Sequence, residues 1–105
     1  MEEKTEFLYV AQEQDIPLNE RLFIEINEQP IVIFNLGGKL FAIGDVCTHD
    51  NGPVGDGQVD GYEVVCPRHG ARFDIRSGKA TKSPAFRDVP SYQIKVEDGK
   101  IFIKI

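Results

Sequence analysis

The residues best suited to chemistry in this chain are its two cysteines and two histidines, which all lie in two short motifs. The first motif, Cys-x-His, holds Cys47 and His49, and the second, Cys-x-x-His, holds Cys66 and His69. Each motif therefore supplies one thiolate and one imidazole. Thiolate and imidazole ligands together favour zinc or an iron–sulfur cluster. The sequence thus predicts a metal centre at these four residues.

The two motifs resemble those of the Rieske iron–sulfur family, in which a Cys-x-His loop and a Cys-x-x-His loop hold one [2Fe–2S] cluster. Gly52-Pro53 after the first histidine and Gly70 after the second also fit the family pattern. In a Rieske cluster one iron takes both thiolates and the other takes both imidazoles. The resemblance therefore implies one [2Fe–2S] cluster per chain, bound by Cys47, His49, Cys66 and His69.

Two other arrangements of these four residues remain open from the residues alone. Two cysteines and two histidines are a familiar ligand set for structural zinc, although zinc fingers usually bring each cysteine pair and each histidine pair on its own loop. A disulfide between Cys47 and Cys66 is uncommon in a reducing cytosol and leaves the neighbouring histidines unexplained. A zinc-stabilised interaction module is therefore the alternative to a cluster protein.

Length and charge limit the functions open to this chain. Its 105 residues form one domain with no room for a second, catalytic domain. A net charge of −5 disfavours nucleic acid and anionic membranes and favours docking to a basic protein surface. The first six residues are too polar for a signal peptide, and no apolar run approaches the roughly 20 residues that span a bilayer. The sequence predicts a cytoplasmic protein without nucleic-acid or membrane partners.

The chain lacks the residues that an enzyme of this family would need. Ligation of both histidines leaves none for a catalytic triad or dyad. Residues 55–60 end in Asp60 where a phosphate-binding glycine pattern needs glycine. A Rieske oxygenase also needs a mononuclear iron with two further histidines and a carboxylate, and the chain has no further histidine. We therefore predict an electron-transfer component rather than an enzyme.

The family resemblance also implies partners. Rieske ferredoxins of this size take electrons from an NAD(P)H-dependent flavin reductase, and pass them singly to a terminal oxygenase that often dihydroxylates aromatic rings. The expected partners are thus a flavin-dependent ferredoxin reductase and a terminal oxygenase or another electron acceptor. A redox sensor, or an accessory subunit of another reductase, would use the same cluster and stays open.

Departures from the high-potential branch of the family predict a low reduction potential. Respiratory Rieske proteins carry a serine and a tyrosine where this chain has Ala71 and Phe73, so two hydroxyl donors to the cluster are missing. They also join their ligand loops by a disulfide, at positions that hold Gly52 and Arg68 here. Hydrogen bonds to cluster sulfurs raise the potential. We expect a value near the low end of the Rieske range, on the order of −150 mV.

Apolar patterning predicts strands over 6–11, 21–27 and 31–34, with a loop and one helical turn over 12–20. Gly-Gly and Asp-Gly pairs favour two-residue hairpin turns, because such turns need positive φ angles. The turn at Gly37-Gly38 predicts the pairs Phe34–Phe41 and Val32–Ile43. The turn at Asp98-Gly99 predicts the pairs Val96–Ile101, Ile94–Ile103 and Tyr92–Ile105.

Two more hairpins are expected between residues 58 and 82. Asp60-Gly61 would place Val59 opposite Tyr62, and Ser77-Gly78 would bring Ile75 near Ala80. The glycine-rich segment 44–61 must turn tightly and approach another group closely. The segment Ser83-Pro84-Ala85-Phe86 resembles the proline loop that covers a Rieske cluster, and a plain connector is the alternative.

These expectations combine into an all-β fold. Residues 1–44 and 82–105 would form an antiparallel β-sandwich base, and residues 45–81 a smaller inserted lobe that carries both ligand motifs. The family resemblance implies the same division within a single domain, 1–105. We also expect the lobe to hold few apolar residues of its own and to depend on the metal for order.

Overall fold

The computed structural model describes residues 6–48, 52–83 and 87–104. Nearly all of its regular structure is strand. The elements in chain order are β1 (Phe7–Gln12), the 3-10 helix η1 (Glu13–Asp15), β2 (Arg21–Ile26), β3 (Gln29–Leu36), β4 (Lys39–Gly44), β5 (Gln58–Asp60), β6 (Glu63–Val65), β7 (Arg72–Asp74), β8 (Ala80–Lys82), β9 (Ser91–Tyr92), β10 (Ile94–Glu97) and β11 (Lys100–Lys104). The all-β prediction is confirmed, and η1 supplies the helical turn expected between the first two strands.

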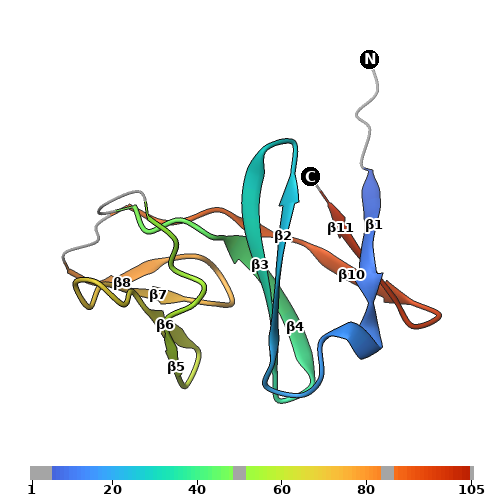
Figure 1. The fold of residues 1–105 in the computed structure, drawn as a ribbon, viewed down its shortest axis with the longest axis horizontal. Helices are drawn as coiled ribbons and strands as arrows, with labels where there is room; N and C mark the ends of the chain where they lie inside the picture. Colours follow the sequence, from blue (N-terminus) through green and yellow to red (C-terminus); the bar gives the residue numbers. More distant parts are fainter. Residues whose placement is uncertain (1–5, 49–51, 84–86, 105) are drawn as a thin grey trace.

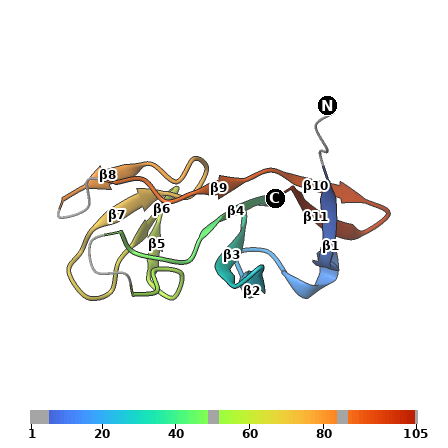
Figure 2. The ribbon, with the colours of Figure 1, turned by 90° about the horizontal axis from the view of Figure 1, so that it is seen from above.

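The strands form three antiparallel sheets (Figure 1). The outer sheet has the order β1-β11-β10, the middle sheet β2-β3-β4-β9 and the lobe sheet β5-β6-β7-β8. Figure 2 shows the middle sheet between the other two. The strands of the lobe sheet follow one another along the chain between β4 and β9. The lobe sheet therefore forms at one end of the molecule and the outer sheet at the other.

Strand β3 contributes to two separate cores. Successive side chains of a strand point to opposite faces. Ile31 and Ile33 belong to a buried cluster shared with Ile101 and other residues of the outer sheet. Val32 and Phe34 belong to a second cluster, which contains both cysteines and the buried residues of the lobe sheet. Burial on both faces explains why residues 31–34 are continuously apolar rather than alternating.

The lobe sheet buries its apolar side chains in a core that it shares with the middle sheet. Val54, Val64, Phe73 and Ile75 are completely buried, and they pack in the cluster that also contains Phe34 of the middle sheet. Burying a side chain of this kind contributes about 1.5–3 kcal/mol. These few residues pack against a neighbouring sheet rather than only against each other, and the dependence of the lobe on the metal for order stays a prediction.

Both predicted hairpins outside the lobe sheet are confirmed. Gly37 and Gly38 have φ angles of 62° and 99°. Strand pairing gives Phe34–Phe41, Val32–Ile43, Ile94–Ile103 and Val96–Ile101 as predicted. The predicted pair Tyr92–Ile105 cannot be compared, because Ile105 lies outside the described residues; Tyr92 itself lies on β9 and pairs with Ala42.

The hairpin between β5 and β6 differs from the prediction by a shifted register. Its turn consists of Gly61 and Tyr62, and Val59 pairs with Val64 instead of Tyr62. This register places Val59 beside Val64, on the face that packs against the second core cluster. Tyr62 stays about half exposed, with the Arg76 guanidinium 4.2 Å from its ring centre. Burial of the valines therefore decides the register.

The hairpin between β7 and β8 is longer than predicted. Phe73, rather than Ile75, pairs with Ala80, and residues 75–79 form the connection. Ile75 is fully buried, and its N–H donates to the Tyr62 carbonyl at 2.7 Å. Because Ile75 is anchored to the neighbouring turn, the chain cannot reverse directly at residues 77 and 78.

Candidate metal centre

Two ligand loops project from the lobe side of the molecule. The first ligand loop (residues 45–57) joins β4 to β5, and the second (residues 66–71) joins β6 to β7. Cys47 and Cys66 are both buried and belong to the same core cluster. The structure shows no disulfide between them. The fold therefore brings the two predicted thiolate ligands into one buried region.

The two predicted imidazole ligands are described unequally. His69 lies in the second ligand loop and is exposed. His49 lies outside the described residues. Among the residues that are described, no group of three or more histidine, cysteine or acidic side chains is arranged to hold a metal ion. The complete ligand set therefore stays a prediction.

Backbone hydrogen bonds close the second ligand loop at its base. The Cys66 N–H donates to the Ala71 carbonyl at 2.7 Å, and the Gly70 N–H donates to the Cys66 carbonyl at 3.0 Å. Gly70 has a φ of 77°, a region that glycine occupies without strain. Cys66 is thus fixed at the end of β6 while His69 is presented outward.

Asp45 organises the first ligand loop, and sequence reasoning did not identify it. Its Oδ1 accepts the Val54 N–H at 3.0 Å and the Gly55 N–H at 2.6 Å, so it joins the two ends of the loop. Within the loop, the Cys47 N–H donates to the Gly52 carbonyl at 2.6 Å. An aspartate just after a strand is a common turn former, which was the available signal.

Arg21 is a second organising residue that the sequence did not reveal. From β2 its Nη1 donates to the Gly55 carbonyl at 2.5 Å and to the Gly57 carbonyl at 2.7 Å. Its guanidinium carbon also lies 5.0 Å from the ring centre of Phe34. Arg21 of the middle sheet therefore holds the end of the first ligand loop. No local sequence pattern indicates this contact, because 34 and 36 residues separate the bonded partners.

Close packing explains part of the glycine content of this segment. A Cβ at Gly57 would lie 1.9 Å from the Val65 carbonyl oxygen, a distance that backbone cannot accommodate. A Cβ at Gly55 would lie 2.8 Å from Asp45 Oδ1. The close approach expected of this segment is found at Gly57, where the neighbour is the backbone of Val65.

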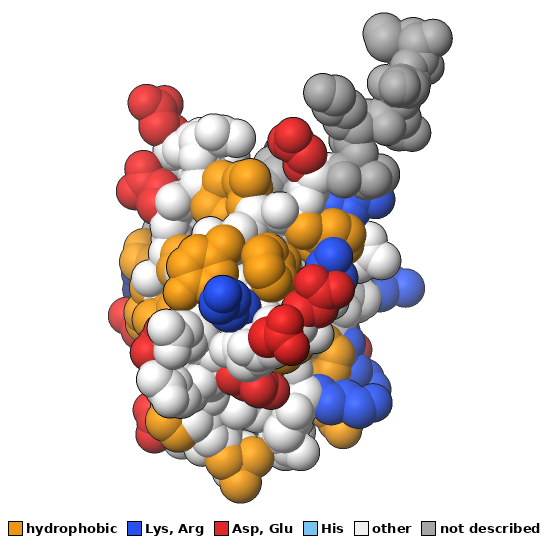
Figure 3. Space-filling view, turned by 90° about the vertical axis from the view of Figure 1, so that its right-hand side faces the viewer, with side chains coloured by type: hydrophobic (Ala, Val, Ile, Leu, Met, Phe, Trp, Pro, Cys, Tyr) orange, Lys and Arg blue, Asp and Glu red, His pale blue; other side chains and the backbone are white. Residues whose placement is uncertain are grey.

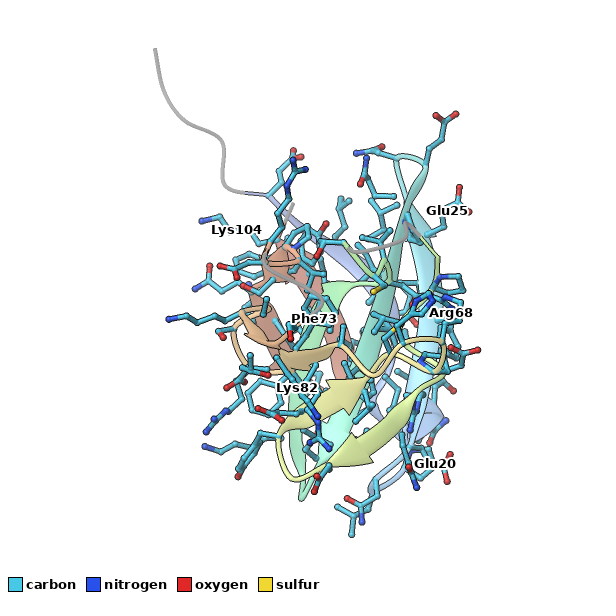
Figure 4. The ribbon with its side chains drawn as sticks, turned by 90° about the vertical axis from the view of Figure 1, so that its left-hand side faces the viewer. Glu20, Glu25, Arg68, Phe73, Lys82 and Lys104 are labelled. Atoms are coloured by element: carbon cyan, nitrogen blue, oxygen red, sulfur yellow. The ribbon has the colours of Figure 1, made fainter. Side chains whose placement is uncertain are left out.

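Arg68 belongs to the second ligand loop and its side chain reaches the first; Figure 4 shows it on the lobe side of the molecule. Its Nη2 donates to the Pro53 carbonyl of the first loop at 2.8 Å. The same nitrogen lies 3.5 Å from the Cys66 sulfur. The positions where a respiratory Rieske disulfide would lie are thus adjacent in this fold, and a guanidinium occupies the space between the loops.

The segment before β9 also contacts the first ligand loop. The Thr48 hydroxyl donates to the Arg87 carbonyl at 2.7 Å, and the Val89 N–H donates to the Gly78 carbonyl at 2.8 Å. Of the predicted covering loop, Ser83 is described and exposed, whereas residues 84–86 lie outside the described residues. The choice between a covering loop and a plain connector therefore stays open.

The pKa shifts in the lobe sheet arise from hydrogen-bonded ion pairs among its own residues. Hydrogen bonds from Arg76 lower the pKa of Asp74, and the reciprocal bonds raise the pKa of Arg76. A hydrogen bond to Asp60, with a second to Glu63, raises the pKa of Arg72. These pairs join neighbouring strands and turns of the lobe sheet.

The donor set fits the cluster that the family resemblance implies. Two buried thiols and an exposed imidazole match the sulfur-ligated and nitrogen-ligated irons of a Rieske centre. Zinc accepts the same donors, so the side chains alone do not separate the two metals. Across the described part of the chain, no helix has the length and apolarity that a membrane span requires.

Comparison with known proteins separates these possibilities. The model of the Rieske [2Fe-2S] domain matches residues 6–93. The chain is 37% identical over 100 residues to the 3-phenylpropionate/cinnamic acid dioxygenase ferredoxin subunit of Escherichia coli (strain K12). That alignment covers 93% of this chain and 92% of the relative.

Solved structures show the same fold. The Sphingomonas yanoikuyae B1 ferredoxin superposes with a TM-score of 0.86 at 29% identity, covering 95% of this chain and 99% of that one. A chain from the complex of reduced oxygenase and oxidized ferredoxin in carbazole 1,9a-dioxygenase gives a TM-score of 0.85 at 23% identity, with coverage of 93% and 92%. This protein therefore belongs to the Rieske [2Fe–2S] family and carries electrons on one [2Fe–2S] cluster.

Proposed function

We propose that this protein is the ferredoxin of a multicomponent oxygenase. In this role it takes single electrons from an NAD(P)H-dependent flavin reductase and passes them to a terminal oxygenase. The observation that carries the proposal is the match with a dioxygenase ferredoxin subunit over nearly all of both chains. The named relatives serve oxygenases for different aromatic compounds, so the proposal does not specify a substrate.

The ligands of the cluster are proposed to be Cys47, His49, Cys66 and His69. When bound, the cluster accepts and releases one electron at a time. The chain contributes two things that the described geometry supports. Burial of both cysteines keeps water from the thiolate side, while exposure of His69 leaves the imidazole side open to a partner. Electron transfer is then favoured at the surface that contains His69.

The organisation of the chain suits a small carrier. We propose a single domain in which residues 1–44 and 82–105 form the base and residues 45–81 the cluster-binding lobe. The separate lobe sheet and the second core cluster support this division. A net charge of −5 supports transient docking to a basic surface of the reductase or the oxygenase. A cytoplasmic location is part of the same proposal.

Reconstitution tests this function. The flavin reductases and Rieske oxygenases encoded by the host would be purified, and each pair would be mixed with NADH or NADPH, an aromatic substrate and this protein. We expect product with at least one pair, and no product when the Cys66→Ser variant replaces the protein. If no pair forms product while another class of enzyme reoxidises the reduced protein, the carrier serves a different acceptor and the proposal is wrong.

A further inference from the structure

Arg68 contacts both ligand loops through one end of its side chain. Nη2 donates to the carbonyl oxygen of Pro53, in the first loop, at 2.8 Å. It also lies 3.5 Å from the sulfur of Cys66, in the second loop. Resting on the ligand set proposed above, we propose that Arg68 is a positioning residue that fastens the second ligand loop to the first and raises the reduction potential of the cluster.

The guanidinium of Arg68 packs closely against the backbone of the first ligand loop at Gly52, a position that we call its seat. A Cβ built at Gly52 would lie 2.7 Å from Nη2 and 2.8 Å from the guanidinium carbon of Arg68. Glycine at position 52 therefore allows the guanidinium to lie directly against the backbone of this loop. The neighbouring Gly52 carbonyl accepts the Cys47 N–H at 2.6 Å, so the seat is also tied to the first cysteine.

The chemistry of arginine suits this position better than that of other cations. A guanidinium is planar and carries five N–H donors in a fixed arrangement, so it can bond to a carbonyl and a sulfur at once. It also stays protonated at any pH at which the protein is folded. Arg68 therefore places a positive charge beside the Cys66 sulfur.

Two consequences follow from these contacts. A charged N–H donor close to a cluster sulfur stabilises the additional electron of the reduced state, so it raises the potential. The bond to Pro53 holds the first loop against the second, so it slows the opening that releases the cluster. The first effect depends on the charge near sulfur, and the second depends on the geometry of the bond across the loops.

Substitution of Arg68 separates the two effects. Arg68→Gln removes the charge, so we expect a lower potential by protein-film voltammetry. We also expect roughly tenfold faster loss of visible absorbance in the presence of a chelator, the size expected when one charge-assisted hydrogen bond is removed. Arg68→Lys keeps a charge but loses the planar fork. Its potential should lie between those of the unmutated protein and Arg68→Gln, while its cluster is also lost faster.

Arg87→Gln is the matched control for the loss of one positive charge. Arg87 is exposed, and its backbone carbonyl accepts the Thr48 hydroxyl, so it lies near the first ligand loop. The change removes the same charge without touching the Cys66 sulfur. If Arg87→Gln and Arg68→Gln shift the potential and the rate of cluster loss equally, the effect is one of net charge and the proposal is overturned. Unmutated values for Arg68→Gln would also overturn it.

Gly52→Ala provides a second test in case Arg68→Gln retains no cluster, an outcome that itself supports the fastening role. The added methyl group must displace the guanidinium from its seat, although the charge of the chain is unchanged. We expect a lower potential and faster cluster loss than in the unmutated protein. An unchanged potential in Gly52→Ala would show that the seat of Arg68 has no influence on the cluster.

Discussion

The outer sheet and the lobe sheet keep their strands in place by different means. The outer sheet depends on cross-strand pairs of apolar residues, such as Ile94–Ile103 and Val96–Ile101. Figure 3 shows its exposed face, on which hydrophobic side chains gather among lysine and acidic residues. There Tyr9 and Phe102 meet edge to face, with ring centres 6.0 Å apart. These contacts are between neighbouring strands and repeat along them.

In the lobe, single polar side chains instead hold the first ligand loop, which leads into the sheet, by bonds to backbone nine or more residues away in the sequence. Asp45 and Arg21 together hold four backbone groups at residues 54, 55 and 57 of the first ligand loop. Such bonds fix a few atoms accurately, whereas apolar pairs fix a whole face. The ligand loops therefore depend on accurate backbone positions, whereas the outer sheet depends on the burial of apolar side chains.

The largest expected effect comes from removing a cysteine. Cys47→Ser and Cys66→Ser should each give colourless protein, because a cluster loses a thiolate ligand. The hairpin at Asp98-Gly99 should stay folded, since the outer sheet has its own core. Visible absorbance and amide exchange would measure the two regions separately. Loss of the outer sheet together with the cluster would contradict the independence of the two ends.

Iron and sulfide analysis of the unmutated protein accompanies this experiment. One [2Fe–2S] cluster should give about two irons and about two acid-labile sulfides per chain. One zinc ion and no sulfide would contradict the cluster assignment.

Asp45→Ala should destabilise the lobe sheet and leave the outer sheet almost unchanged. The substitution leaves the N–H groups of Val54 and Gly55 without their carboxylate acceptor. Hydrogen bonds to charged groups contribute about 1.5–3 kcal/mol each, so we expect a loss of that order in the opening free energy of the first ligand loop. Amide exchange at β5 and β6 would measure it.

Glu97→Ala is the matched control on the outer sheet. Glu97 is exposed, and its carboxylate lies 3.9 Å from Lys95 Nζ, a surface pair worth about 0–1 kcal/mol. Equal effects of the two substitutions would show that the contrast between the sheets does not exist.

The reduction potential tests how closely the lobe core approaches the cluster. We expect about −150 mV, because Ala71 and Phe73 provide no hydroxyl donor. Both residues are fully buried in the core cluster of the cysteines, and Ala71 accepts the Cys66 N–H. Ala71→Ser and Phe73→Tyr should each raise the potential if the new hydroxyl reaches a sulfur. Voltammetry of the three proteins would measure this, and an unmutated value near +300 mV would contradict the assignment to the low-potential branch.

The smallest expected effect is an acid-dependent loss of stability at Asp74. Hydrogen bonds from Arg76 lower the pKa of Asp74 below its unfolded value of 3.8. A carboxyl group with a lowered folded pKa stabilises the fold above its unfolded pKa, and this stability is lost as the pH falls through the folded pKa. Asp74→Asn should therefore flatten the decline in unfolding free energy below about pH 4. An identical acid profile for both proteins would show that the pair is not coupled to folding.

The sequence predicts the hairpins outside the lobe sheet more accurately than those within it. Turn residues such as Gly37-Gly38 and Asp98-Gly99 act locally, so their hairpins and registers could be predicted. The turn formed by Asn27 and Glu28 was missed, although both have positive φ angles of 52° and 66°, because glutamate rarely signals such a turn. The pairing of β2 with β3 imposes that conformation on the turn.

In the lobe sheet the registers were wrong where distant contacts decide them. Val59 pairs with Val64 because both face a core that includes the middle sheet, which the local sequence does not show. The cysteine and histidine motifs could be identified from residue type and spacing alone. Asp45, Arg21 and the bridging contacts of Arg68 could not, because they join residues that only the fold brings together.

Because β3 is buried on both faces, its length can change without exchanging those faces only by an even number of residues. Ile31 and Ile33 face the outer sheet, whereas Val32 and Phe34 face the cysteines. Insertion or deletion of one residue within this strand would exchange the two faces, so that both cores would receive side chains of the wrong shape at the same time. A change of two residues would preserve the faces and move only the hairpin ends. Length variation in this protein should therefore be tolerated in steps of two at β3, and its two ends cannot vary in length independently there.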